Sequence, residues 1–223
     1  MVFRIATAVV LPLALAGAAC QDNWQSFVIE ANLQPGDPPE CAIPTDRGAA
    51  GYLGGVLDIS VRYSYSACLF VSNRLVKRED YGVPRAESNM ILVQGAYLRF
   101  EPDPNDPAPA LLPDQDIPFA GSIPPQDNST MCIPIIPSSI GGLLAPDRMF
   151  VAVVQFYGVT LGGIDVLTQE FRYPVWTCAG CLAGCPNDTN PLTPACECPT
   201  GNPEGDPPCR PGQDEWFDRC HIQ

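Results

Sequence analysis

The sequence predicts an all-β protein: an antiparallel β-sandwich of immunoglobulin-like architecture, followed by a cysteine-rich, disulfide-stapled C-terminal extension. Three observations support this class. Apolar and polar residues alternate with a period of two in several segments. Turns are marked by 26 prolines and 19 glycines, and no segment shows the period of an amphipathic helix. We divide the chain into a signal peptide at 1–19, the sandwich at 20–177 and the Cys/Pro-rich tail at 178–223.

The strand prediction begins with Leu57–Ser66, where apolar and polar residues alternate strictly over the whole segment. A strand places these apolar side chains on one face, whereas a helix would scatter them. Phe27–Leu33 repeats the period. In Met90–Phe100 the apolar phase changes at Gln94 and Gly95, which predicts a strand with a bulge, because glycine tolerates that distortion.

A long antiparallel hairpin is predicted near the end of the sandwich region. Two apolar stretches, Phe150–Leu161 and Ile164–Trp176, flank a pair of glycines that can adopt the positive φ of a tight primed turn. Gln169 is the one exception to the alternation of the second stretch. Cys132–Ile136 adds a short strand, and Asp103–Asp116 reads as a Pro/Asp-rich loop. We therefore expect six to eight strands in total.

The first residues have the three-part layout of a secretory signal. Arg4 supplies the positive start, Ile5–Leu15 is an uncharged run, and small residues follow it. The run is shorter than the about 20 residues that a membrane-spanning helix needs. We therefore expect the signal to be cleaved and the chain to be exported.

The segment from Leu15 to Cys20, Leu-Ala-Gly-Ala-Ala-Cys, resembles the lipobox of bacterial lipoproteins. In that family the cysteine is acylated and becomes the new N-terminus, so the resemblance implies a lipid on Cys20 that binds the membrane. It covers residues 1–20 only, and Gly17 stands where the family usually has an aliphatic residue. Ordinary cleavage after Ala18, giving a secreted protein, is the alternative. Gln21 favours the outer membrane, as implied by the family's sorting pattern.

Cysteine parity supports the lipid and constrains the disulfides. The chain has 11 cysteines, and an exported chain is expected to pair its thiols. Without Cys20, the sandwich and the tail each contain an odd number of cysteines. If all ten are oxidised within one chain, at least one bridge joins the two regions, through Cys41 or Cys132 rather than Cys68, which follows the alternating strand directly. The predicted disulfide cysteines are Cys41, Cys68, Cys132, Cys178, Cys181, Cys185, Cys196, Cys198, Cys209 and Cys220.

Other interpretations of the tail cysteines are weaker. Cys178, Cys181, Cys185, Cys196 and Cys198 have spacings typical of zinc or iron–sulfur ligands, but an oxidising compartment favours disulfides. The run from Cys196 to Gly201 resembles the C-x-C-x-x-G of EGF-like modules over six residues. A small extension without a hydrophobic core needs disulfides for stability, whether or not it is EGF-like.

A calcium site at Asp103, Asn105 and Asp106 is also disfavoured. The segment lacks the glycine and the distal bidentate glutamate of a calcium-binding loop. We therefore predict no metal and no cofactor.

Composition narrows the function. The net charge is −13, or −14 once Arg4 leaves with the signal, so the chain repels phosphate backbones and we expect no nucleic acid as a partner. His221, the only histidine, lies two residues from the C-terminus, a poor place for a catalytic base. We find no GxSxG, HExxH or P-loop motif, predict no catalytic residue and expect no enzyme.

The function expected from these exclusions is that of a binding or adhesion module. An anchored sandwich would present its loops to an envelope or surface ligand whose identity is unknown. A structural envelope component is the alternative. A carboxylate-dependent glycan hydrolase is a distant third, because the 25 acidic residues leave carboxylate pairs open.

Overall fold

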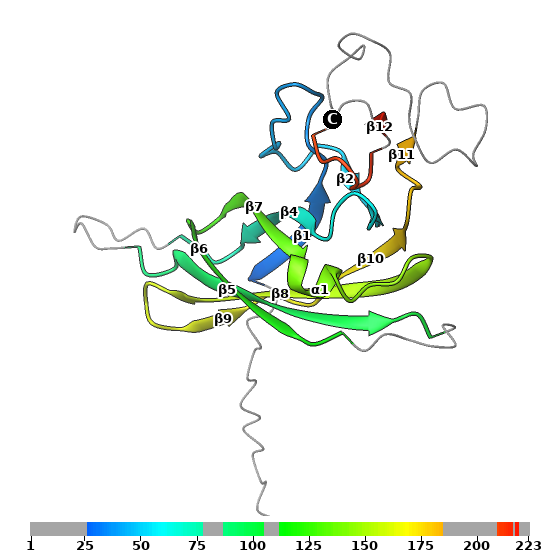
Figure 1. Ribbon diagram of the computed structural model, residues 1–223. Helices are drawn as coiled ribbons and strands as arrows, with labels where there is room; N and C mark the ends of the chain where they lie inside the picture. The colour runs from blue at the N-terminus through cyan, green and yellow to red at the C-terminus, as the bar shows by residue number, and fades with distance from the viewer. Residues whose placement is uncertain (1–25, 78–86, 105–111, 185–208, 216, 219–223) are drawn as a thin grey trace, which may run out of the picture.

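The computed structural model describes residues 26–77, 87–104, 112–184, 209–215 and 217–218. Within these ranges two sheets face each other across one apolar core, and the only helix is the single turn α1 (Ser138–Gly141) (Figure 1). The predicted all-β fold is confirmed. No helix in the described ranges is long and apolar enough to cross a membrane.

The first sheet has four antiparallel strands in the order β2-β1-β4-β7. Its strands are β1 (Phe27–Leu33), β2 (Gly51–Tyr52), β4 (Tyr65–Asn73) and β7 (Asp127–Ile136). Both expected strands in this sheet, at Phe27–Leu33 and Cys132–Ile136, are confirmed.

The second sheet has the order β3-β10-β8-β5-β6, and β9 pairs with β8. Its strands are β3 (Gly55–Asp58), β5 (Ile91–Pro102), β6 (Gln115–Ile123), β8 (Arg148–Thr160), β9 (Asp165–Leu167) and β10 (Phe171–Cys178). Its pairings are antiparallel except that β3 joins β10 in parallel. A separate parallel pair consists of β11 (Ala183–Gly184) and β12 (Phe217–Asp218).

The prediction of one strand over Leu57–Ser66 is wrong. β3 ends at Asp58, and β4 begins at Tyr65 in the other sheet. Asp58 ends its strand because its Oδ1 accepts hydrogen bonds from the amide (3.0 Å) and the hydroxyl (2.6 Å) of Ser60. Such local bonds compete with the sheet ladder. The alternating sequence therefore crosses between two sheets.

The predicted bulge in β5 is confirmed. Its register shifts between Val93 and Gly95 against both β6 and β8. The loop predicted at Asp103–Asp116 ends earlier than expected, since Gln115 already begins β6. Residues 105–111 of that loop lie outside the described ranges.

The predicted hairpin is present, with β8 as one arm and β9 and β10 as the other. The second arm is interrupted at Thr168, whose Oγ1 accepts the amide of Phe156 (2.9 Å) while its own amide donates to the Phe156 carbonyl (2.9 Å). Gln169, the exception to the alternation, lies in this interruption. The side chain of Thr168 thus replaces a regular ladder contact.

Three disulfides are present among the described residues: Cys41–Cys209, Cys68–Cys132 and Cys178–Cys181. The first joins the sandwich region to the tail, as predicted from the cysteine count, and uses Cys41 on the sandwich side. The second joins β4 to β7 at directly opposed positions. The remaining cysteines, Cys20, Cys185, Cys196, Cys198 and Cys220, lie outside the described ranges.

Candidate functional site

The tail segment 209–215 returns to the sandwich and packs beside β3 and β4. Gln213 is buried and binds the backbone of Ser66 with both ends of its amide: Nε2 donates to the carbonyl (2.7 Å) and Oε1 accepts from the amide (2.9 Å). Arg210 donates to the same carbonyl (2.7 Å) and to the sulfur of Cys68 (2.8 Å). The tail end is therefore held by polar contacts and by the Cys41–Cys209 bridge.

Asp214 extends this cluster into the core. Its Oδ1 accepts the amide of Val56 (2.8 Å), and its Oδ2 accepts the hydroxyl of Tyr65 (2.6 Å), which also lies 2.8 Å from the hydroxyl of Tyr173. Burial raises the pKa of Asp214 despite these hydrogen bonds. Burial also raises the pKa of Tyr173 to about 12. A raised carboxyl pKa suits a general acid, but both oxygens of Asp214 already hold the tail in place.

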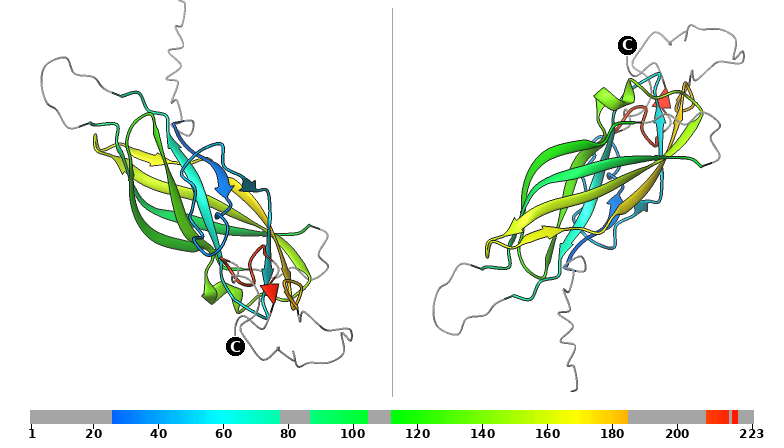
Figure 2. Two further views of the ribbon diagram at one scale, coloured as in Figure 1. Left: turned by 90° about the horizontal axis from the view of Figure 1, so that it is seen from above. Right: turned by 90° about the horizontal axis from the view of Figure 1, so that it is seen from below.

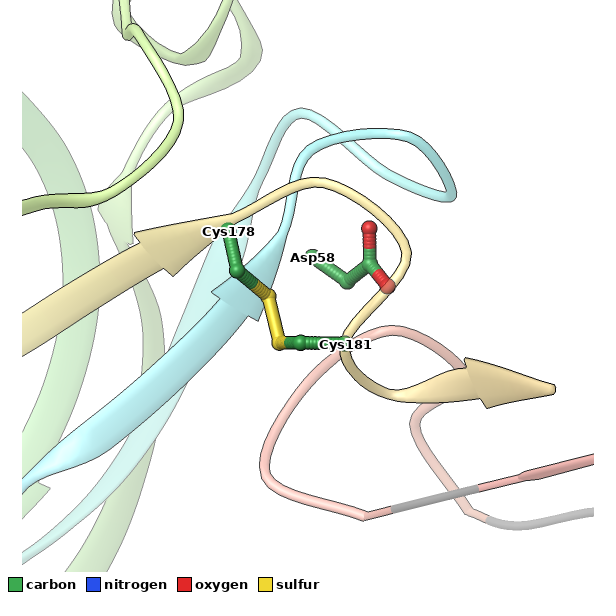
Figure 3. Close-up of side chains that lie close together, drawn as sticks. All are labelled: Asp58, Cys178 and Cys181. Atoms are coloured by element: carbon green, nitrogen blue, oxygen red, sulfur yellow. A yellow bond between two sulfur atoms is a disulfide. The ribbon is translucent and has the colours of Figure 1, made fainter. Parts of the chain in front are cut away.

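A second cluster, Asp58 with Cys178 and Cys181, lies where β10 leaves its sheet (Figure 3). The ligand atoms of these residues lie within 4.8 Å of one another. The carboxylate of Asp58 accepts the amides of Gly180 (2.8 Å) and Leu182 (3.0 Å). Burial favours a higher pKa for Asp58, but these bonds and those from Ser60 outweigh it and lower the pKa.

This second cluster fastens the chain after β10. The two sulfurs form a disulfide, which offers no thiolate to a metal. The Asp58 carboxylate is already the acceptor for the loop that this disulfide closes. The expectation of a disulfide at Cys178 and Cys181 therefore agrees with the structure.

The outward side of the six-stranded sheet, which we call the outer face, presents a different set of residues. Successive side chains of a strand point to opposite faces, so the residues between core positions lie outward. Three large side chains on this face are exposed: Tyr97 on β5, Met149 on β8 and Trp176 on β10. Met149 and Trp176 are directly opposed across the two strands.

An ion-pair network crosses the middle of the outer face. Arg99 contacts Glu101 and Glu170 (2.9 Å to the latter), and Arg172 contacts the same two carboxylates (3.8 Å to Glu170). Hydrogen bonds from Arg172 and Arg99 lower the pKa of Glu101. Val153 on β8 is paired with Arg172 on one side and with Arg99 on the other. Its side chain lies on this face but is only 2% exposed. The arginine stems therefore cover an apolar patch.

A tyrosine pair extends the outer face over β5 and β8. The rings of Tyr97 and Tyr157 stack with centroids 4.4 Å apart, and Tyr157 donates to Asp116 on β6 (2.8 Å). This hydrogen bond raises the pKa of Tyr157. A Cβ at Gly95 would lie 2.4 Å from the Tyr157 hydroxyl, so the ring rests on the bulge of β5. The tyrosine ring covers the glycine, as aromatic side chains do in other sheets.

A cavity of about 370 Å³ lies beside β1. Glu30, Arg47 and Arg74 line its charged part, and Phe70 and Gln169 line it as well. Glu30 pairs with both arginines, at 2.8 Å from Arg47 and 3.0 Å from Arg74. Burial would raise the pKa of Glu30, but hydrogen bonds from Ser72 and Arg74 and the two positive charges lower it.

The sequence-predicted positions are only partly brought together. Cys20, His221, Asn105 and Asp106 lie outside the described residues, whereas Asp103 follows the end of β5. The outer face was missed, because its members occupy the outward positions of strands recognised by their core residues. The alternating positions of Tyr97 and Arg99 within β5 carry that signal. Searches among protein-family models and curated proteins find no match to this chain.

Proposed function

We propose that this protein is a non-enzymatic binding or adhesion module of the bacterial cell envelope, anchored to the outer membrane by a lipid on Cys20. The observation that carries the proposal is the outer face, with Tyr97, Met149 and Trp176 exposed around an Arg/Glu network. Tyrosine, tryptophan, methionine and arginine are enriched where proteins bind proteins. The partner we propose is therefore an envelope or surface protein.

The scaffold favours such a role for two reasons. The backbone of the paired strands β5, β8 and β10 is already ordered, so none of the contact energy is spent on ordering a loop. The described tail segments also leave this face open, because they lie on the other side of the molecule (Figure 1). The described parts of the tail therefore do not compete with a partner for the outer face.

The binding face is tested by substitution of its aromatic anchors. Tyr97→Ala and Trp176→Ala should each weaken capture of the envelope partner in a cross-linking pull-down by tenfold or more, since truncated hot-spot residues typically cost about 2 kcal/mol. Tyr63→Ala is the matched control, because Tyr63 is exposed in the turn between β3 and β4. Equal capture by all three variants would show that the outer face is not the binding site.

The anchor has its own test. Cys20→Ser should move the protein from the membrane fraction to the soluble fraction, and the unsubstituted mature protein should carry an acyl mass on its N-terminus. The expectation follows from the lipobox-like segment and the odd cysteine count. Unchanged fractionation without an acyl mass would rule out the lipoprotein proposal.

A further inference from the structure

Several segments that are distant in sequence meet where β1 begins, and we call this region the N-terminal end. The amide of Arg74 donates to the carbonyl of Ser26 (2.6 Å), and the side chain of Asn89 donates to the carbonyl of Val76 (2.6 Å). The amide of Leu161 donates to the carbonyl of Met90 (2.9 Å). Figure 2 shows the start of β1 and the tip of the β8–β9 hairpin at one end of the elongated molecule, with β12 at the other.

Three aliphatic side chains at the N-terminal end face solvent. Val76 is 68% exposed, Leu161 is 47% exposed and Ile164 is 54% exposed. Leu161 and Ile164 flank a tight turn in which Ile164 donates to the hydroxyl of Thr160 (3.1 Å) and Gly163 has a φ of 82°. Hairpin turns are usually polar, so aliphatic residues fixed on both sides of one indicate a contact surface.

The chain length places this end close to the proposed lipid. Ser26 lies six positions after Cys20. A chain spans at most about 3.3–3.6 Å per residue, so Ser26 lies within about 20 Å of an acylated Cys20. The sandwich is about as long as its 13-residue strand β8, or roughly 40 Å at about 3.4 Å per residue. The segment between Cys20 and Ser26 is therefore too short for the tail end of the sandwich to face the bilayer as readily as the N-terminal end.

We infer that Val76, Leu161 and Ile164 dock into the interface of the bilayer that holds the lipid on Cys20; this inference rests on the lipid anchor of the proposed function. The contact is apolar rather than electrostatic. Lys77 is next to Val76, but Asp127 and Asp165 lie at the same end, and the whole chain carries −13. Docking should therefore occur on neutral lipid and change little with salt.

Docking in this way would also set the direction of the binding face. Strand β5 begins and strand β8 ends near the N-terminal end. Strand β10 pairs with the half of β8 farther from that end, so all three strands would run away from the membrane. The outer face would then stand upright and remain accessible from the side, and the tail end would point outward. A flexibly tethered sandwich would lack this fixed orientation.

The inference is tested with tryptophan probes in the acylated, full-length protein. Ile164→Trp places a probe at the N-terminal end, and Leu53→Trp is the control, because Leu53 is 95% exposed and follows β2 at the opposite end of β1. Both sites face solvent, so both variants should fold, and near-UV circular dichroism verifies this. In vesicles of brominated phosphatidylcholine, the fluorescence added at position 164 should fall by about twofold or more, because docked side chains reach about 5–10 Å into the interface. The fluorescence added by the tryptophan at position 53 should not fall.

The outcomes separate the two proposals. An acyl mass on Cys20 with equal, weak quenching at positions 164 and 53 would overturn the docking inference and leave the anchor intact. Absence of the acyl mass would overturn both. Selective quenching at position 164 in protein that carries the acyl mass would support both.

Discussion

The two ends of the sandwich are built in opposite ways. At the tail end, a disulfide from Cys41 to Cys209 and a buried polar cluster around Asp214 hold a distant segment against the strands. At the N-terminal end, the described contacts are turns, backbone hydrogen bonds and hydrogen bonds from the side chains of Asn73 and Asn89, without a disulfide, and Leu161 and Ile164 are exposed. The tail end is therefore cross-linked by a disulfide, whereas the N-terminal end has no described disulfide and exposes aliphatic side chains.

The difference follows from composition. The tail segment 209–215 reads Cys-Arg-Pro-Gly-Gln-Asp-Glu and has no aliphatic side chain apart from proline. It cannot be held by hydrophobic burial, so it is held by hydrogen bonds that each contribute a net of about 1 kcal/mol. A covalent bridge supplies the rest. The N-terminal end needs no such bridge, because its segments are the ends and turns of strands that are already paired within the two sheets.

The largest expected effect comes from opening the tail end. The double substitution Cys41→Ser/Cys209→Ser should lower the free energy of unfolding by up to about 5 kcal/mol in the chain-entropy description, because this bridge spans 168 positions. Denaturant unfolding under non-reducing conditions measures the loss. The control Cys178→Ser/Cys181→Ser removes a bridge that spans three positions and should lose only about 2 kcal/mol. A smaller loss at Cys41 than at Cys178 would contradict the view that the tail end depends on its long bridge.

A second prediction concerns packing at the same end. A Cβ at Gly141 would lie 1.7 Å from the backbone carbonyl of Tyr63, so Gly141→Ala must push two backbones apart. We expect a loss of about 1–3 kcal/mol, as for other overpacked sites. Gly142→Ala is the control, because the nearest atom to its Cβ would be 3.8 Å away and its φ is −67°. Thermal unfolding compares the two, and equal melting temperatures would show that α1 is not packed against Tyr63 as described.

The sequence predicts the strands whose alternation stays within one sheet. Phe27–Leu33 and the bulged strand of Gly95 are such cases. Their core residues alternate on each side of a register shift, which follows Ile29 in the first strand and Val93 in the second. Leu57–Ser66 misleads, because its alternation continues through a turn fixed by the side chain of Asp58. β6 was missed although Ile117, Phe119 and Ile123 alternate with more polar neighbours, since Pro118 interrupts the run and is tolerated only because β6 is an edge strand.

The candidate sites were less predictable than the fold. Parity of cysteines predicts a bridge between sandwich and tail, but not which tail cysteine it uses. The Asp214 cluster joins residues that are 149 positions apart, Tyr65 and Asp214, and no local pattern encodes that contact. The outer face is likewise formed by the register of β5, β8 and β10. Such contacts depend on tertiary structure, which a single sequence does not specify locally.

The smallest expected effect is a pH dependence that differs in sign between the tail end and the outer face. The pKa of Asp214 is raised above its ordinary value of 3.8 in the folded protein. Its contribution to stability is therefore fully present below pH 3.8 and is lost as the pH rises through the folded pKa. Asp214→Asn keeps an acceptor for the Val56 amide, and asparagine tolerates the φ of 61° at this position. Relative to the unsubstituted protein, this variant should gain stability as the pH rises.

Glu101→Gln on the outer face is the matched control, because the arginines lower the pKa of Glu101 below its ordinary 4.5. Its contribution is present above pH 4.5 and is lost as the pH falls through the folded pKa. This variant should therefore lose stability relative to the unsubstituted protein as the pH rises, by a small amount, since exposed ion pairs contribute little. Chemical unfolding between pH 3 and pH 7 measures both slopes. Slopes of the same sign would contradict the assignment of a protonation-favouring site to the tail end and a charge-favouring site to the outer face.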